Sequence, residues 1–331
     1  MDDLNGTIDP RCLGDRPLTM EVINYLSVFG ITLYTILTFM TLVSIIVFLE
    51  MCVYIYKKVP YPKKTNIVWV IGAAPVISTM CCLGLWIPRA TLFTDMTSNS
   101  YFAIVIYKFL ILLFEECGGE EAFLRYSEKK TIKVSTGPCC CCCPCLPPVS
   151  ITRRLLFLLK LGSLQYAILK TVFSIFSIAL WANGNFDVST VRDIYGTALW
   201  INLFVGVLTI IGLWPIGIMF MHVRDSLRPL KIMPKYAMYQ LVFVLSQLQA
   251  AIINILAVNG VIACSPPFSS VARGSTFSQQ LMIVELFVIT LVTRMLYRRI
   301  YEPVNLDPHE NDNEMNVKIR LCPNSVEEHT A

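Results

Sequence analysis

Residues 30–56 read GITLYTILTFMTLVSIIVFLEMCVYIY, and Lys57 and Lys58 follow directly. This run is long enough to cross a bilayer as a helix, since about 20 apolar residues span about 30 Å of hydrocarbon. A helix also bonds its backbone amides and carbonyls internally, which lipid requires. Lysines flanking a span favour the cytosolic side. The stretch therefore predicts a membrane-spanning helix whose C-terminal end is cytosolic.

Apolar runs of this kind recur along the chain. The sequence is 55% hydrophobic and only 15% charged, whereas a soluble domain carries about 25% charged residues. We therefore expect an all-α, polytopic membrane protein with seven transmembrane helices. The spans are predicted at 30–56, 67–87, 101–117, 158–182, 196–220, 236–259 and 279–298. The chain opens with Met1-Asp2-Asp3, unlike the basic start of a signal peptide, so we expect the first span to be retained.

The lysines and arginines predict the orientation of the spans. Of 27 such residues, 19 fall in loops 56–66, 118–157 and 221–235 or at the C-terminal end, and five fall on the opposite side. Because cytosolic loops carry the excess of positive charge, the N-terminal arm 1–29 is predicted to be extracellular. The membrane domain then covers 30–300, and the polar tail 301–331 reads as a disordered cytosolic segment.

The N-terminal arm contains Asn5-Gly6-Thr7, which matches the N-glycosylation sequon. Glycosylation of Asn5 agrees with an extracellular arm, although short sequons also arise by chance. Two cysteines, Cys12 and Cys264, are the only ones predicted to face the outside. That compartment permits a disulfide between them, and two free thiols are the alternative.

A cysteine block lies in the cytosolic loop 118–157, shortly before the fourth span. Thiolate metal sites usually space their ligands, as in C-x-x-C, so consecutive cysteines fit a metal poorly. The cytosol also disfavours disulfides. We favour S-palmitoylation, because each buried methylene contributes about 0.8 kcal/mol toward holding the loop at the bilayer. A metal site and a thiol-rich loop without a specific role are the alternatives. The cysteines are Cys139, Cys140, Cys141, Cys142, Cys143 and Cys145.

Polar residues inside the spans are candidates for substrate binding. Lys170 lies near the middle of the fourth span, where a charge costs about 2.5–3.5 kcal/mol unless it is paired or hydrated. Ser163, Ala167, Ser174 and Ser177 share its helix face. Glu285 of the seventh span is the natural opposite charge. A structural Lys170–Glu285 pair and attraction of an anionic substrate by Lys170 are both open interpretations.

The sixth span carries Gln240, Gln247 and Asn254 at heptad spacing. A regular helix would place these amides on one face. Such a stripe can hold helices together, or it can offer hydrogen bonds to the polar groups of an otherwise apolar ligand.

Several functional classes fit the sequence poorly. The third span ends FEECGG at residues 114–119, without the Asp/Glu-Arg-Tyr motif of G-protein-coupled receptors, and the seventh lacks Asn-Pro-x-x-Tyr. The chain has three histidines, and His309 and His329 lie in the tail. We therefore expect no enzyme, no catalytic residues, no metal or other cofactor, and no nucleic-acid partner.

The chain resembles the alpha subunits of organic solute transporters. The matching segments are GLWIPR at 84–89, GPCCCCCPC at 137–145, LQYAILK at 164–170, TALWIN at 197–202, ACSPP at 263–267 and TRMLYRR at 293–299. The resemblance implies facilitated, bidirectional transport of bile acids, conjugated steroids and related amphipathic anions. It also implies an obligate small single-span beta subunit and the basolateral plasma membrane of epithelia. A seven-span receptor or scaffold without transport activity is the alternative.

Overall fold

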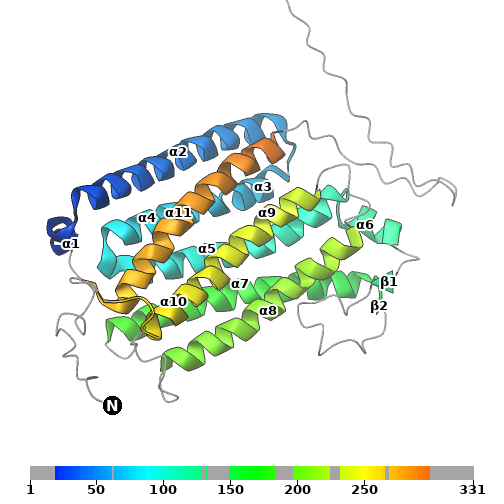
Figure 1. Cartoon of the computed structure of the whole chain (residues 1–331). Coiled ribbons are helices and arrows are strands. Elements are labelled where there is room, and N and C mark those ends of the chain that lie inside the picture. The colour runs from blue at the N-terminus through cyan, green and yellow to red at the C-terminus, as the bar shows by residue number, and fades with distance from the viewer. Residues whose placement is uncertain are drawn as a thin grey trace, which may run out of the picture.

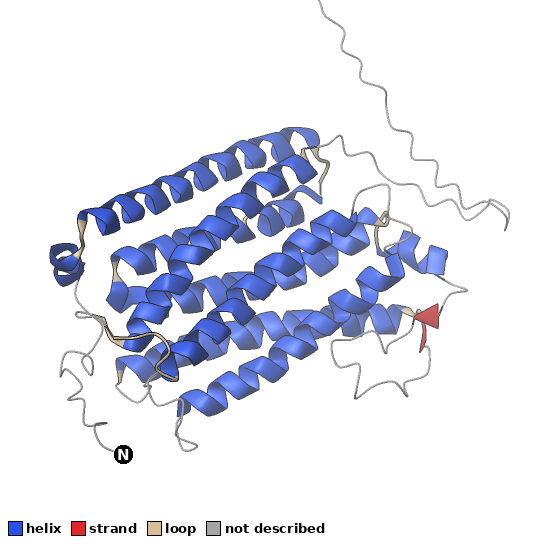
Figure 2. Ribbon diagram, viewed as in Figure 1, coloured by secondary structure: helices blue, strands red, loops and turns tan. Residues whose placement is uncertain are grey.

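The structure, a computed structural model, describes residues 19–61, 63–127, 131–132, 149–183, 197–223, 232–264 and 268–298. Within these ranges, seven helices are long and apolar enough to cross a membrane, as predicted. They lie side by side in one bundle, with α2 and α11 along one edge and α8 along the other (Figure 1). Apart from one short strand pair, the described structure is helical (Figure 2).

Four α-helices form the first three spans, and among the described residues one short helix precedes them. A short helix, α1 (Thr19–Tyr25), precedes α2 (Val28–Lys58), whose first turn is capped by Ser27. The second span consists of α3 (Lys63–Ile71) and α4 (Ala73–Trp86), which meet at Gly72. A short 3₁₀ turn at Pro88–Ala90 leads into α5 (Thr91–Glu116), the third span.

A small connecting region, with one helix and two short strands among its described residues, separates the third span from the fourth. Helix α6 (Glu120–Ser127) and the strands β1 (Thr131–Ile132) and β2 (Val149–Ser150) lie at one end of the bundle (Figure 1). The later spans are listed here in chain order: α7 (Arg153–Ala182), α8 (Thr197–Val223), α9 (Ile232–Val244) continuing through a π-helical segment (Leu245–Gln249) into α10 (Ala250–Val258), and α11 (Ser270–Tyr297).

Two helices begin nine or ten residues earlier than the sequence predicted, the largest differences among the spans. The predicted third span starts at residue 101 and the seventh at residue 279, but α5 starts at Thr91 and α11 at Ser270. The added turns are rich in Ser and Thr, whose hydroxyls donate to carbonyls of the preceding turn. Thr97 bonds the Phe93 carbonyl at 2.8 Å, and Thr276 bonds the Ala272 carbonyl at 3.0 Å. These bonds satisfy the hydroxyls locally, so polar residues extend a helix that hydropathy alone cuts short.

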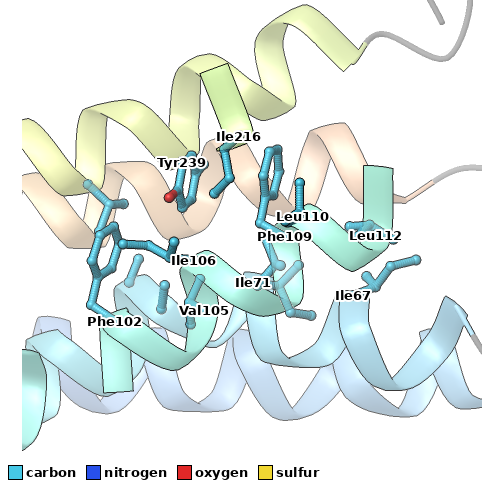
Figure 3. Close-up of a cluster of buried hydrophobic side chains, with 14 of the residues drawn as sticks. Ile67, Ile71, Phe102, Val105, Ile106, Phe109, Leu110, Leu112, Ile216 and Tyr239 are labelled. Atoms are coloured by element: carbon cyan, nitrogen blue, oxygen red, sulfur yellow. The ribbon is translucent and has the colours of Figure 1, made fainter. Parts of the chain in front are cut away.

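The packed core surrounds α5, which contacts α3, α4, α7 and α8. Its centre is an aromatic stack in which the rings of Phe109 and Tyr239 lie parallel, with centroids 4.5 Å apart (Figure 3). Phe102 stacks on the other side of Tyr239 at 5.7 Å. Ile106 and Leu110, on the same helix as Phe109, are fully buried beside these rings. Rigid aromatic packing therefore fills the middle of the bundle.

Ion pairs gather at the end of the bundle that carries α6. Glu50 of α2 accepts from Arg294 of α11 at 2.6 Å, with Arg298 at 3.8 Å. Lys63 and the buried Glu116 lie 3.5 Å apart. Ion pairs also join α6 to the start of α7: Arg153 to Glu121 and Lys160 to Glu120. Charged side chains that would be costly in hydrocarbon are therefore paired near the helix ends.

Helices α7 and α8 approach each other closely at Gly212. The buried Tyr166 of α7 lies against this glycine, and a Cβ added at Gly212 would fall 2.4 Å from Tyr166 Cγ. Small residues of this kind allow membrane helices to pack closely.

We predict that Gly212→Val lowers the thermal unfolding midpoint of the purified protein, because overpacking a tight contact costs about 1–3 kcal/mol. Gly206→Val on the same helix is the matched control, since a Cβ there meets no atom within 4 Å. Fluorescence-monitored unfolding in detergent measures both variants. Equal decreases in the unfolding midpoint of the two variants would show that the Tyr166–Gly212 contact does not cause the loss of stability.

Candidate functional site

A polar cavity of about 340 Å³ lies in the half of the bundle away from α6. It is lined by α4, the first turns of α5, the π-helical segment with α10, and the first turns of α11, and it is partly open. Two of its lining residues, Phe102 and Met282, belong to the packed core. Its polar lining residues are Asp95, Ser98, Asn99, Ser246, Gln247, Asn254, Ser275, Ser278 and Gln279. The early turns of α5 and α11 thus supply most of the polar groups.

The π-helical segment shapes one wall of this cavity. Such segments widen one helical turn and are frequent at functional sites. Here the segment presents Ser246 and Gln247 to the cavity, and Gln247 Nε2 donates to Asn99 Oδ1 of α5 at 2.6 Å. Of the predicted amide stripe, Gln247 and Asn254 line the cavity and Gln240 does not. Gln240 lies seven residues before Gln247 on α9, outside the part of this span that lines the cavity.

Gln279 is the most deeply buried amide of the cavity lining, with 5% of its surface exposed. Its Nε2 lies close over Gly84 of α4, where an added Cβ would fall 2.6 Å from that atom. This Nε2 is buried and has no hydrogen-bond partner. A buried donor without an acceptor costs free energy, and this nitrogen lies against α4.

The predicted Lys170–Glu285 pair is not formed. Among the described residues, no ion pair or hydrogen bond reaches Lys170, and Glu285 faces the Gln249 amide of the π-helical segment instead. Glu285 lies on α11 beyond the cavity lining. Helix order explains the difference, because α7 packs against α5 and α8 rather than against α11.

Lys170 belongs to a second polar region, on the buried face of α7. As predicted, Lys170 and its neighbours on that face are buried: Lys170 is 8% exposed, Ser163 is fully buried, and Ser174 and Ser177 are nearly so. Ser163 donates to the Gly212 carbonyl of α8 at 3.3 Å. The part of this face nearest the start of α7 therefore turns toward α8. None of these residues lines the cavity. Lys170 and the amide groups therefore form separate sites.

Several predicted sites lie outside the described residues. These are Asn5, Cys12 and the block from Cys139 to Cys145. The strands β1 and β2 pair on either side of the segment that carries the block. Cys264 is disulfide-bonded, while the four other cysteines in the described ranges are free thiols. Because Cys12 is not described, the Cys12–Cys264 disulfide stays a prediction.

Comparisons with known proteins give a consistent result. The family described as "Organic solute transporter Ostalpha" matches residues 33–303. "Organic solute transporter subunit alpha" of Danio rerio is 64% identical over 305 residues, covering 92% of this chain and 93% of the relative. The Homo sapiens protein of the same name is 39% identical over 316 residues, covering 95% and 93%. "Organic solute transporter alpha-like protein 3" of Caenorhabditis elegans is 25% identical over 162 residues, covering 48% and 46%. No solved structure matches the chain.

We predict that Asn99 and Gln247 are energetically coupled across the cavity. In a double-mutant cycle, Asn99→Leu and Gln247→Leu should show an interaction free energy of about 0.6 kcal/mol, the average for hydrogen bonds between membrane helices. Unfolding in detergent with a chemical denaturant provides the four free energies. The control pair Asn99→Leu and Gln240→Leu should be additive. Additivity of the Asn99–Gln247 pair as well would mean that the bond does not tie α5 to the π-helical segment.

Proposed function

The chain belongs to the organic solute transporter alpha family, and from this premise we propose that it carries bile acids, conjugated steroids and related amphipathic organic anions across the plasma membrane. Transport is facilitated and bidirectional, driven by the gradient of the substrate itself. The protein works as the alpha subunit of a heteromer with a small single-span beta subunit. In epithelia we place it in the basolateral membrane.

The observation that carries this proposal is a polar cavity inside an otherwise apolar seven-helix bundle. Its volume of about 340 Å³ falls within the range of about 300–1,000 Å³ typical of small-molecule sites. Its lining combines amides and hydroxyls with apolar side chains such as Ile77 and Met282. This mixture suits a substrate with a large apolar body and a few polar groups.

Lys170 supports the anionic part of the proposal. It is a buried cation with no counter-charge among the described residues, and an unpaired cation in a membrane is costly unless a ligand or water compensates it. We assign it to attraction of the anionic end of the substrate. Ser174, one turn away on the same buried face, is a further hydrogen-bonding group there.

The orientation proposed for the bundle has two supports. The ion pairs of Arg153 and Lys160 with α6, together with Lys57 and Lys58 in the last turn of α2, lie at the end that carries α6, which favours that end as cytosolic. Cys264, near the opposite end, is disulfide-bonded, and disulfides persist in oxidising compartments. We therefore propose an extracellular N-terminus with glycosylated Asn5, a Cys12–Cys264 disulfide, and acylation of the cytosolic cysteine block.

The direct test is flux of a labelled conjugated bile acid in cells that express this chain alone, the chain with its beta subunit, or neither. We expect uptake and efflux only with both subunits, each following the imposed substrate gradient. A heteromer at the cell surface that produces no flux in either direction would contradict the proposal and favour a receptor or scaffold.

We predict that Lys170→Ala raises KM for a steroid sulfate about tenfold or more, because a hydrogen bond to a charged group contributes about 1.5–3 kcal/mol. Surface level and association with the beta subunit should stay at the unsubstituted level. Lys170→Arg, which keeps the charge, should recover most of the affinity. An unchanged KM for Lys170→Ala would remove this residue from substrate recognition.

A further inference from the structure

The end of α2 lies beside the end of α11 and the start of α3 at one corner of the bundle (Figure 1). Basic side chains from all three helices gather there. They are Lys57 and Lys58 in the last turn of α2, Lys64 in the first turn of α3, and Arg294 and Arg298 at the end of α11. We call these five residues the basic corner. Lys63 does not belong to it, because this lysine pairs with the buried Glu116.

The basic corner carries more positive charge than the bundle neutralises. Glu50 accepts from Arg294 at 2.6 Å and lies 3.8 Å from Arg298. Among the described residues, no other carboxylate lies within ion-pair distance of the corner. Five cations therefore share one carboxylate. Lys57 and Lys58 are exposed as well, so their ammonium groups can reach an anion outside the bundle.

Tyrosine rings orient two cations of the corner. Lys64 Nζ lies 5.3 Å from the ring centroid of Tyr56, and Arg298 lies 5.8 Å from that of Tyr54. Such cation–π contacts place a cation without cancelling its charge. Tyr54 and Tyr56 point to different sides of α2, because two residues turn a helix by about 200°. The end of α2, with Lys57 and Lys58, thus has a cation of α11 on one side and a cation of α3 on the other.

The basic corner lies at the depth of the lipid headgroups. Along α2, Leu49 and Val53 are more than half exposed, and hydrocarbon covers such apolar surface on a spanning helix. Tyr56 and Tyr61 are exposed next along the chain, and tyrosine is enriched where hydrocarbon meets water. Lys57 follows Val53 by about one helical turn. The cations therefore begin where the lipid-facing apolar surface ends.

We infer that the basic corner binds the headgroup of an anionic phospholipid in the cytosolic leaflet. Lys57 and Lys58 donate to the phosphate and to the further anionic group of the headgroup. The acyl chains lie against the exposed apolar side chains of α2. Clusters of this size next to a span attract anionic lipids, and each Lys or Arg strengthens binding about fivefold. The choice of leaflet rests on the orientation proposed above, whereas the binding itself rests on the charges of the corner.

The test uses the purified full chain in detergent micelles. Dye-labelled, short-chain phosphatidylserine is the probe, and phosphatidylcholine with the same dye is the neutral reference. Fluorescence anisotropy gives a Kd for each lipid. We expect the unsubstituted chain to prefer phosphatidylserine by about 20-fold or more. Lys57→Gln should lower this preference about fivefold, and Lys57→Gln with Lys58→Gln about 20-fold, by the same scale. Kd for phosphatidylcholine should not change.

Arg125→Gln with Arg154→Gln is the matched control. It removes the same charge from exposed residues at the same end of the bundle, but on α6 and α7, and it should leave the preference unchanged. Lys57→Arg with Lys58→Arg keeps the charges and should keep the preference. Equal Kd values of the unsubstituted chain for the two lipids, or an equal loss of preference in the control, would overturn the inference. Because the measurement involves no transport, either result would leave the proposed function standing.

Discussion

Inside hydrocarbon a polar group must find a partner within the protein or face water, and this constraint decides where the polar side chains of the bundle lie. Threonines and serines of α2, α5 and α11 bond carbonyls of their own helices, so they add polar atoms at small cost. Charged residues pair near the helix ends. Four amides line one cavity: Asn99, Gln247, Asn254 and Gln279. Gln279 Nε2 is one of several buried atoms of the described residues that lack a hydrogen-bond partner, and Lys170 is a buried cation on α7.

Gln279 and Lys170 lie in different parts of the bundle. Gln279 faces α4 from α11, while Lys170 lies on the face of α7 that packs toward α5 and α8. Their chemistry differs as well, since one is a neutral donor and the other a cation. An amphipathic anion has the same division, with uncharged hydroxyls on its rings and a charge at its end. In the bundle, the polar cavity and Lys170 likewise lie apart, since Lys170 does not line the cavity.

Hydropathy predicted all seven spans because each apolar run is long and the basic loops alternate. It missed the first turns of α5 because Thr91–Ser100 reads as a polar loop, although hydroxyls bonded to the preceding turn keep it helical. Heptad spacing grouped Gln240 with Gln247, but seven residues are about 10 Å of helix, and the cavity reaches only the residues from Ser246 onward in this span. The prediction of a Lys170–Glu285 pair was wrong. Helix periodicity tells which face of a helix carries a residue, but it does not tell which other helix packs against that face.

We propose that substrate occupies the polar cavity, which lies in the half of the bundle that we propose faces the outside. It can be tested with Ser275→Cys in a Cys81→Ser background, since both residues line the cavity and Cys81 would otherwise react. The measurement is the rate at which a membrane-impermeant thiol reagent, applied from outside, modifies the new cysteine in the heteromer. The account predicts modification that a trihydroxylated bile acid conjugate slows in proportion to its occupancy. Modification at the same rate with saturating substrate, or none at all, would contradict it.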